Sequence, residues 1–550
     1  MTEKNKKISK NITYFLFFIF FLVGLFTFKD YGMWTDEEFQ RFSGFYWLNY
    51  VLSFTSFGEF KNLLTLKLNQ IGDFTLPSPE YHPYYGVIFD LPAAFLELIF
   101  KVDDPKNYFY LRHILNFILF FIGSIFFYKL LLNRFSNYSV SLIGTLFFVL
   151  SPRIYGSSFF NNKDVVFLSL ISIALYYAFK AIDKPSYKNL LVFSMFAALS
   201  TAHRILGVLL PLSFLTFIFL SALSNNKKSN HLLSIVFFCI SYYIFLILFW
   251  PALWSGPIEN LILAFRWFSQ QILEVKMLFA GEYIYTNFLP YNYIFTWIFI
   301  TTPVLYIILF VIGYVLIFKR FFLKFLNIKD NTSHHDLWRG ANEKKDLFIF
   351  FNITIVVSYF ILSDVILYNG WRHIYFINIF LIYIATYAFY RIDIYMHLKN
   401  KNNFHYYISV LFLITITYKM IVYHPFQNIY FNNYFNKISH HNYEIDYDGL
   451  SGKKFLREIL ALEKNKNIIN IGVASWYPLQ RSIKLLDKKD RKKINIVGQE
   501  FQKADFIYSN FTSEVDKNIN DKYKIPSNFT TIDKFILDNI RVYEVFKKNK

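Results

Sequence analysis

The apolar stretch Ile12–Phe28, followed by Tyr31-Gly-Met-Trp-Thr-Asp-Glu-Glu-Phe-Gln-Arg41, determines how the chain can fold. At about 1.5 Å per residue, the apolar part is nearly long enough to cross a bilayer as a helix. Four lysines precede it within the first ten residues, and three consecutive acids, Asp36 to Glu38, follow it. No small-residue cleavage site precedes the acids, so we expect an uncleaved anchor with a cytoplasmic amino end and the acids at its outer end.

The rest of the chain repeats this pattern of long apolar blocks separated by short charged loops. Hydrophobic residues make up 55% of the 550 residues, which is too many for a soluble protein and typical of a polytopic membrane protein. Ten further apolar runs lie at roughly residues 110–132, 138–152, 164–182, 190–203, 205–223, 231–250, 292–318, 346–365, 374–392 and 405–423. We therefore predict an all-α membrane domain of about eleven spans, in which 190–223 could also be a tight hairpin or one broken helix.

Charged residues divide the loops between these runs into two alternating sets. One set is basic and comprises Arg134, Lys180, Lys184, Lys188, Lys227, Lys228, the loop Lys319–Lys345, Arg391, Lys399 and Lys401. The other set holds the acids and the unusual polar clusters, and comprises residues 30–106, 151–164, the turn near Arg204, 254–290 and Asp364–His373. Basic loops stay in the cytoplasm, so the polar clusters are expected to share the outer side of the membrane.

Composition excludes several classes of function. The 57 Lys and Arg residues outnumber the 38 acids but are spread over many loops, so no nucleic-acid-binding patch is predicted. The single cysteine, Cys239, rules out an internal disulfide and a cysteine-based metal site. The abundance of Phe, Ile, Asn and Lys fits an AT-rich bacterial genome, so we expect a protein of the bacterial inner membrane.

Two of the outer loops are too long to be simple connections and should have structure of their own. Apolar residues recur at helical spacing from Phe39 to Val51, and residues 87–100 form a second apolar run that carries Asp90 and Glu97. Residues 258–268 show the same pattern in the loop 254–290. We interpret these segments as helices that lie along the membrane interface.

The character of the chain changes at Tyr443, after which no segment could span a membrane. Lys454–Leu462 has a helical pattern, and residues 468–474, 494–497 and 505–509 are typical of buried strands. Residues 534–537 and 540–546 indicate a hairpin that turns at Asp538-Asn539. The sequence therefore predicts a membrane domain at 1–442 and a small α/β domain at 443–550, which span parity places outside.

Polar clusters at the outer ends of several spans could converge on one site. They are Asp36-Glu-Glu38, Ser151-Pro-Arg-Ile-Tyr155, Asn161-Asn-Lys-Asp164, Thr201-Ala-His-Arg204 and Asn369-Gly-Trp-Arg-His373. A carboxylate can accept a proton from an attacking hydroxyl, and Arg or Lys can neutralise a departing phosphate. The chain has no glycine-rich phosphate loop, so a lipid-linked donor fits better than a cytosolic nucleotide. The alternative is structural: Asp36 could cap a helix, and Arg153 and Arg204 could snorkel to lipid headgroups.

The order of these motifs resembles the polyprenyl-phosphate-sugar-dependent glycosyltransferases of the C superfamily. The similarity is to protein O-mannosyltransferases and lipid A aminoarabinose transferases. It is carried by Asp36-Glu37, Tyr81-His-Pro-Tyr-Tyr, Ser151-Pro-Arg-Ile-Tyr, Asn162-Lys-Asp164, Gly370-Trp-Arg-His-Ile-Tyr-Phe376 and His424-Pro-Phe-Gln-Asn-Ile-Tyr-Phe-Asn432. The last two segments resemble a bacterial branch of unassigned substrate.

This resemblance implies an inverting transfer of a sugar from a polyprenyl-phosphate donor to a glycan, lipid or protein hydroxyl at the outer face. The catalytic candidates are Asp36, as the base, with Glu37 and Asp164. The candidates for holding the donor phosphate are Lys163, Arg204 and Arg372. The candidates for binding substrate are His82, Arg153, Tyr155 and His373, although both histidines could simply be satisfied polar residues.

Cofactors and the exact class of function stay open at this stage. No cofactor is certain, and a divalent metal is possible because His82, Asp36 and Glu37 could assemble a site, yet their separation is no recognised ligand spacing. A transporter or lipid flippase would also have many spans, but its polar residues would lie near the midplane. An O-antigen ligase or polymerase is a nearer rival, and a sensor that uses the C-terminal domain is a third alternative.

Overall fold

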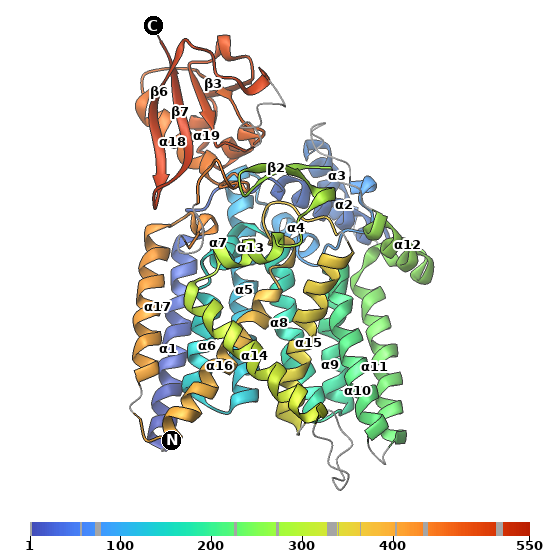
Figure 1. Cartoon of the computed structure of the whole chain (residues 1–550). Helices are drawn as coiled ribbons and strands as arrows, with labels where there is room; N and C mark the ends of the chain where they lie inside the picture. Colours follow the sequence, from blue (N-terminus) through green and yellow to red (C-terminus); the bar gives the residue numbers. More distant parts are fainter. Residues whose placement is uncertain are drawn as a thin grey trace.

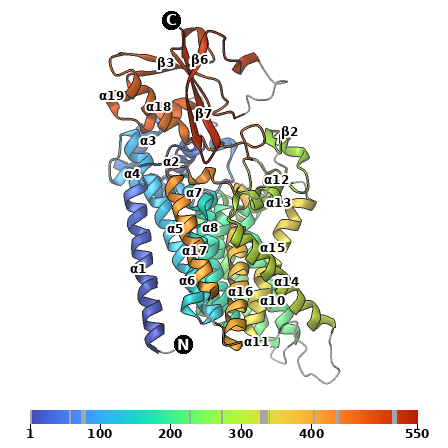
Figure 2. The ribbon, with the colours of Figure 1, turned by 60° about the vertical axis from the view of Figure 1, so that its left-hand side comes forward.

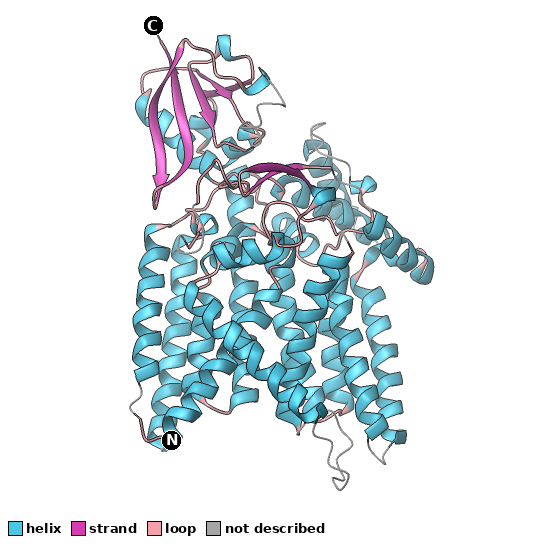
Figure 3. Ribbon diagram, viewed as in Figure 1, coloured by secondary structure: helices cyan, strands magenta, loops and turns pink. Residues whose placement is uncertain are grey.

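The computed structural model describes most of the chain and consists mainly of helices, with two small sheets (Figure 3). The described residues are 3–55, 58–71, 79–224, 228–270, 274–326, 338, 340–363, 365–401, 404–432, 438–512 and 521–549. Several positions used in the sequence predictions lie outside them, among them Lys227, Asp364, and residues 327–337 and 339 of the basic loop.

A bundle of helices forms the membrane part (Figures 1 and 2). Its members are α1 (Glu3–Thr27), α5 (Pro105–Phe135), α6 (Tyr138–Val149), α8 (Asp164–Asp183), α9 (Tyr187–His203), α10 (Leu209–Ser224), α11 (Lys228–Phe249), α14 (Val304–Leu326), α15 (Ala341–Leu362), α16 (Ile377–Leu398) and α17 (Phe404–Val422). The amino terminus lies at one end of the bundle, and the C-terminal domain lies over part of the other, which we call the head end.

The number of spans is lower than the expected eleven. Among the described residues, eight helices are long and apolar enough to cross a membrane, or up to nine if α6 and α7 (Pro152–Phe160) form one span bent by 62°. Each expected apolar run contains a helix, but α9 and α10, with 17 and 16 residues, are shorter than a full crossing requires. The segment 190–223 is therefore two helices joined by a short 3₁₀ turn, Ile205–Val208, rather than one broken helix.

Local sequence signals explain how the bundle turns between α5 and α6. Asp104 caps α5 by accepting a hydrogen bond from the Lys106 backbone nitrogen at 3.0 Å, and Pro105 occupies the first turn. At the other end, Ser136 adopts a left-handed conformation, and the Asn137 side chain caps α6. Asp104 and Pro105 thus fix the start of α5, near which Arg112 and His113 lie, and Ser136 and Asn137 fix the turn into α6.

Helices α5 and α8 pack closely because Gly123 leaves room for the other backbone. The Ser172 hydroxyl of α8 donates a hydrogen bond to the Gly123 carbonyl oxygen at 2.8 Å. A Cβ atom at position 123 would lie 2.9 Å from the Ser169 Cα. The absence of a Cβ atom at position 123 thus sets the distance between α5, which carries Arg112, and α8, which begins at Asp164.

Gly123→Ala is therefore expected to lower the thermal stability of the protein. Overpacking of this kind costs about 1–3 kcal/mol, which outweighs the gain of about 1 kcal/mol in helix propensity. Thermal unfolding in detergent measures the effect. Gly58→Ala is the matched control, because a Cβ at position 58 would have nothing within 4 Å. An unchanged melting temperature for Gly123→Ala would contradict the close approach of α5 and α8.

Shorter elements cover the head end of the bundle (Figures 1 and 2). The first loop contains α2 (Glu37–Ser53), α3 (Gly58–Ile71) and α4 (Asp90–Ile99), so the two helices predicted there are present as α2 and α4. The loop before α13 (Tyr293–Thr301) contains the predicted helix, α12 (Pro257–Gln270), and a hairpin of β1 (Lys276–Phe279) and β2 (Glu282–Tyr285) that the sequence did not indicate.

The C-terminal domain contains a five-stranded mixed sheet, whose strands lie at the segments that the sequence predicted as strands. Its strand order is β4-β3-β5-β7-β6, with β3 parallel to β4 and β5, and β7 antiparallel to β5 and β6. The elements are α18 (Ser451–Leu462), β3 (Ile469–Val473), α19 (Lys488–Arg491), β4 (Ile494–Gly498), β5 (Phe506–Ser509), β6 (Phe529–Leu537) and β7 (Ile540–Lys548). Asp538 and Asn539 both have positive φ at the hairpin turn, which short polar side chains tolerate. The boundary at residue 443 stays a prediction.

Candidate active site

The three consecutive acids at the start of α2 have different surroundings. Glu37 is buried: it accepts a hydrogen bond from the Trp34 backbone nitrogen at 2.9 Å, and the Nε2 atom of His113 lies 3.2 Å from its carboxylate. Glu38 is also buried and forms ion pairs with Lys484 and with Arg481, whose Nε atom is 3.5 Å away. The Asp36 side chain is 39% exposed, against 2% for Glu37 and 7% for Glu38. Asp36 is thus the acid that a substrate could reach.

The Asp36 side chain also does not serve as a cap for the helix that follows it. Asp36 occupies the N-cap position of α2, but in the described structure its carboxylate accepts no capping hydrogen bond. Its contact is with Arg372, whose NH1 atom lies 3.3 Å from Asp36 Oδ2.

Arg372 links Asp36 to the second predicted acid, Asp164. Its NH1 atom lies 3.9 Å from Asp164 Oδ2, and its guanidinium packs on the rings of Trp34 and Tyr368, with centroid distances of 5.2 and 4.9 Å. Arg372 is buried, and within the described part of the chain its Nε atom has no hydrogen-bond partner. A buried guanidinium with donor capacity to spare is suited to an anionic ligand.

Asp164 is held by groups on both of its oxygens. Asn161 donates a hydrogen bond from Nδ2 to Asp164 Oδ2 at 2.8 Å, and its Oδ1 accepts one from the Asp164 backbone nitrogen at 2.8 Å. Arg204, at the end of α9, forms a short ion pair with Asp164 Oδ1. Arg204 is thus paired with an acid of the site, and the structure brings together four predicted residues: Asp36, Asp164, Arg204 and Arg372.

Lys163 has other partners, although it adjoins Asp164 in the sequence. Its ammonium donates a short hydrogen bond to the Gly86 carbonyl oxygen and lies 3.3 Å from Asp90 Oδ2. Asn162 donates a second hydrogen bond to Asp90, at 2.6 Å. Burial lowers the pKa of Lys163 and raises that of Asp90, and the attraction between the two groups opposes both shifts. Lys163 therefore joins α8 to α4 and is already occupied by protein groups.

The predicted substrate-binding residues are more enclosed than expected. Arg153 is 1% exposed, donates hydrogen bonds to the Tyr430 carbonyl oxygen at 2.9 Å and the Tyr447 hydroxyl at 3.1 Å, and packs on Phe431. Tyr155 is buried and packs edge-on against Phe159. Arg153 is thus fully buried rather than snorkelling to headgroups, and it holds the segment that follows α17.

The two histidines lie in aromatic surroundings. His82 packs against the rings of Phe39, Tyr85 and Trp267, at centroid distances of 5.5, 5.3 and 5.7 Å. The ring of His373 lies 4.5 Å from that of Tyr368, next to Arg372. Burial lowers the pKa of both residues, and the charge of Arg372 lowers that of His373 further. Both side chains are therefore expected to be neutral near pH 7. Among the described residues, no three His, Cys, Asp or Glu side chains are grouped so that they could hold a metal ion.

Sequence reasoning also missed Asp448, a buried acid whose pKa is influenced by the charge of Arg372. Asp448 is buried, and its carboxylate accepts a hydrogen bond from Asn428 at 3.0 Å. Burial raises its pKa to about 7, while the positive charge of Arg372 acts in the opposite direction. The signal available in the sequence was the alternation of acids at Glu444, Asp446 and Asp448, which lie at the start of the predicted soluble domain.

A buried network of charges behind the site was also missed. Arg41 of α2 forms a two-pronged pair with Glu97 of α4, with Nε–O distances of 3.1 and 3.0 Å. Arg112 of α5 lies 3.5 Å from Asp90 and 4.0 Å from Glu97. These pairs fix the first loop against the bundle, which explains why the run 87–100 carries two acids among apolar residues.

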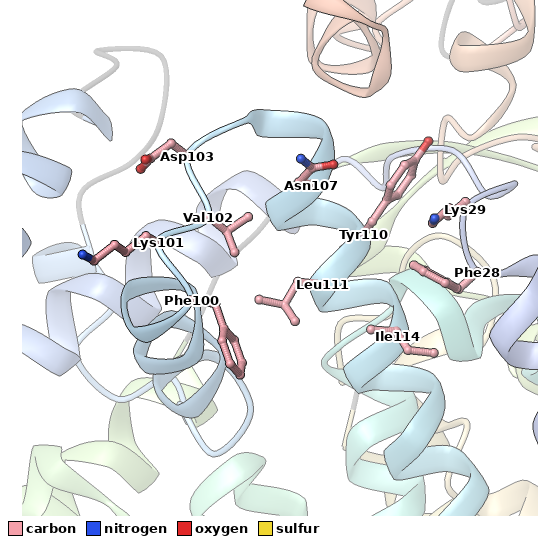
Figure 4. A pocket seen from close by; sticks show the side chains of 10 residues that line it. All are labelled: Phe28, Lys29, Phe100, Lys101, Val102, Asp103, Asn107, Tyr110, Leu111 and Ile114. Atoms are coloured by element: carbon pink, nitrogen blue, oxygen red, sulfur yellow. The ribbon is translucent and has the colours of Figure 1, made fainter.

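A cavity of about 420 Å³ lies near the ends of α1 and α4, on the far side of α5 from this network (Figure 4). Its α5 residues are Asn107, Tyr110, Leu111 and Ile114. These lie on one helical face, whereas Arg112, His113 and Asn116 lie on the opposite face. The cavity therefore contains none of the predicted site residues.

Comparison with known proteins identifies the class of enzyme. Residues 91–254, less than a third of the chain, match the family of dolichyl-phosphate-mannose-protein mannosyltransferases. Over these residues the chain is similar to that family. It is a membrane glycosyltransferase of the C superfamily that uses a lipid-phosphate-linked sugar as its donor. A comparison with curated protein sequences finds no match.

The match to the mannosyltransferase family favours a glycosyltransferase over the transporter and the sensor. The matched region of this glycosyltransferase includes Arg153, Lys163, Asp164 and Arg204. Asp36 and Arg372 lie outside that region, so their place in the site depends on the contacts described above.

Proposed function

We propose that this glycosyltransferase transfers a sugar with inversion from a polyprenyl-phosphate donor to an acceptor hydroxyl, with Asp36 as the general base. One observation carries the proposal: of the three consecutive acids Asp36, Glu37 and Glu38, only Asp36 has an exposed carboxylate, and that carboxylate lies beside a buried arginine. A base must be reachable by the acceptor, whereas a structural acid need not be.

The proposed step balances as a direct displacement. Asp36 accepts the proton of the acceptor hydroxyl while the oxygen of that hydroxyl forms a bond to C1 of the sugar. The bond from C1 to the phosphate oxygen breaks on the opposite face, and its electron pair leaves with the polyprenyl phosphate. Attack opposite the leaving group inverts the configuration at C1.

The role we assign to Arg372 and Arg204 is to stabilise the charge on the departing phosphate. Both are cations at the head end, and Arg372 has an unused donor in the described structure. Asp164 keeps the two guanidinium groups oriented, because its Oδ1 atom contacts Arg204 and its Oδ2 atom contacts Arg372. Both Asp164 oxygens are already engaged, which makes Asp36 the better base.

The test is a transfer assay with purified protein in nanodiscs and a labelled polyprenyl-phosphate hexose. Release of polyprenyl phosphate together with sugar of inverted anomeric configuration on the acceptor supports the proposal. A product that retains the anomeric configuration would require a covalent intermediate and contradicts the single displacement.

We further propose that the head end faces the outside of a bacterial inner membrane and the amino terminus faces the cytoplasm. The alternation of basic loops supports this orientation, as does the position of the two termini at opposite ends of the bundle. An alkaline phosphatase fusion at Lys550 is expected to be active, and a fusion in the 327–337 loop inactive. Activity at Lys550 of a reporter that works only in the cytoplasm would reverse the topology.

A further inference from the structure

We infer that side chains of the C-terminal domain hold the segment Lys29–Glu38, which carries Asp36, and thereby position the base of the active site. The inference rests on the proposed role of Asp36 as the base. It assigns Lys453, Tyr477 and Arg481 as positioning residues for the transfer reaction.

The first attachment is at the end of α1. The buried ammonium of Lys453, on α18, donates hydrogen bonds to three successive carbonyl oxygens, those of Lys29, Asp30 and Tyr31, at 2.5, 3.1 and 3.0 Å. These three residues follow the end of α1 at Thr27, so their carbonyl groups lie outside the helix and take the Lys453 ammonium as their hydrogen-bond partner. Lys453 therefore determines how the chain leaves the membrane helix.

The second attachment lies on both sides of Asp36. The Tyr477 hydroxyl donates a hydrogen bond to the Met33 carbonyl oxygen at 3.2 Å. Arg481 donates a short hydrogen bond to the Thr35 carbonyl oxygen and pairs with Glu38, which Lys484 also contacts. The residue before Asp36 and the acid two positions after it are thus bound by one short stretch of the C-terminal domain.

The backbones of the two parts also approach closely between these attachments. A Cβ atom on Gly32 would lie 2.2 Å from the Leu450 carbonyl oxygen, so this position has no room for a side chain. Met33 is buried in a cluster that includes Leu485 of the C-terminal domain. The segment consequently has little freedom to move while the domain is in place.

This arrangement has a kinetic consequence. A general base must stay within hydrogen-bond reach of the acceptor proton, and misplacement by about 1 Å can cost about 10²-fold in rate. The donor phosphate contacts in the proposal are made by Arg204 and Arg372, which the C-terminal side chains named above do not touch in the described structure. Loosening the segment should therefore lower kcat more than it raises the donor KM.

The experiment compares Arg481→Ala, Arg481→Lys and Tyr477→Phe in the full-length protein, with Lys503→Ala as the matched control. Lys503 is an exposed cation of the same domain, and its ion pair is with Glu500 of that domain rather than with residues 29–38. Hydrogen–deuterium exchange of residues 29–38 is measured together with kcat and the donor KM. Tyr477→Phe removes one hydroxyl and keeps the ring, so it guards against a simple failure to fold.

For Arg481→Ala we expect exchange in residues 29–38 to rise roughly tenfold and kcat to fall roughly 10- to 100-fold, with partial recovery in Arg481→Lys. Tyr477→Phe should show a smaller change in the same direction, and Lys503→Ala none. In an Asp36→Asn background, Arg481→Ala should cause no further loss of kcat, since both changes act through the same group.

Two outcomes overturn the inference. If exchange of residues 29–38 is unchanged in Arg481→Ala, the domain does not hold the segment. If exchange rises while kcat stays at the wild-type value, the domain holds the segment without serving the reaction. Failure of the proposed function is distinguishable from both, because it appears as wild-type activity of Asp36→Asn alone, whatever the exchange data show.

Discussion

Asp36→Asn is expected to lower kcat by about 10²- to 10⁴-fold, which is the usual contribution of a general base. The substitution keeps the size of the side chain and removes its capacity to accept a proton, and the exposed position of Asp36 means that folding should be unaffected. Single-turnover kinetics with a labelled donor measure the chemical step directly. The thermal unfolding curve of the same preparation shows whether the protein remains folded.

Glu38→Gln is the matched control for this prediction. It changes a neighbouring acid in the same way, but Glu38 is enclosed by Arg481 and Lys484 and is not reachable by an acceptor. Its effect on kcat should therefore be smaller than that of Asp36→Asn and no larger than that of Arg481→Ala, because it weakens only one of the contacts that hold the segment. Should Asp36→Asn keep the wild-type rate, the base lies elsewhere in the site, and Asp164 is the next candidate.

The membrane part could be predicted from the sequence because each of its helices coincides with a continuous apolar run. The runs gave the positions of the helices, while the count of spans was too high because runs such as 190–203 are apolar but short. The hairpin at Asp538-Asn539 was predictable for a similar reason, since turn residues and alternation are local signals. The strands β1 and β2 were not predicted because each has four residues, which is too short to show a clear alternation of apolar and polar residues.

The site was predictable only in part. The side of the membrane on which a polar residue lies can be predicted from the sequence, but the direction of its side chain determines which other residues it contacts. Shared sidedness correctly grouped Asp36, Asp164, Arg204 and Arg372. It could not separate Lys163 from Asp164, although successive residues at a helix start point about 100° apart, and Lys163 turns to Asp90 instead. Asp448 and Arg481 approach from far along the chain, and contacts between distant polar residues leave no periodicity to detect.

Arg372→Ala is expected to reduce kcat/KM for the donor by about 10²- to 10³-fold, the usual cost of removing a group that stabilises a developing negative charge. Arg372→Lys should recover only part of this loss. Lysine keeps the charge but lacks the planar fork that matches a phosphate with two hydrogen bonds. Initial rates with each substrate varied in turn should show the effect on the donor and little effect on the acceptor KM.

A purely structural role for Arg372 makes a different prediction, since its contacts with Asp36 and Asp164 also stabilise the fold. Arg153→Lys provides the comparison, because Arg153 is an equally buried arginine whose hydrogen bonds go to Tyr430 and Tyr447. It should lower thermal stability without altering donor kinetics. If Arg372→Ala behaves in the same way, Arg372 is an ion-pair partner of the two acids and the phosphate role passes to Arg204, because Lys163 is already committed to Asp90.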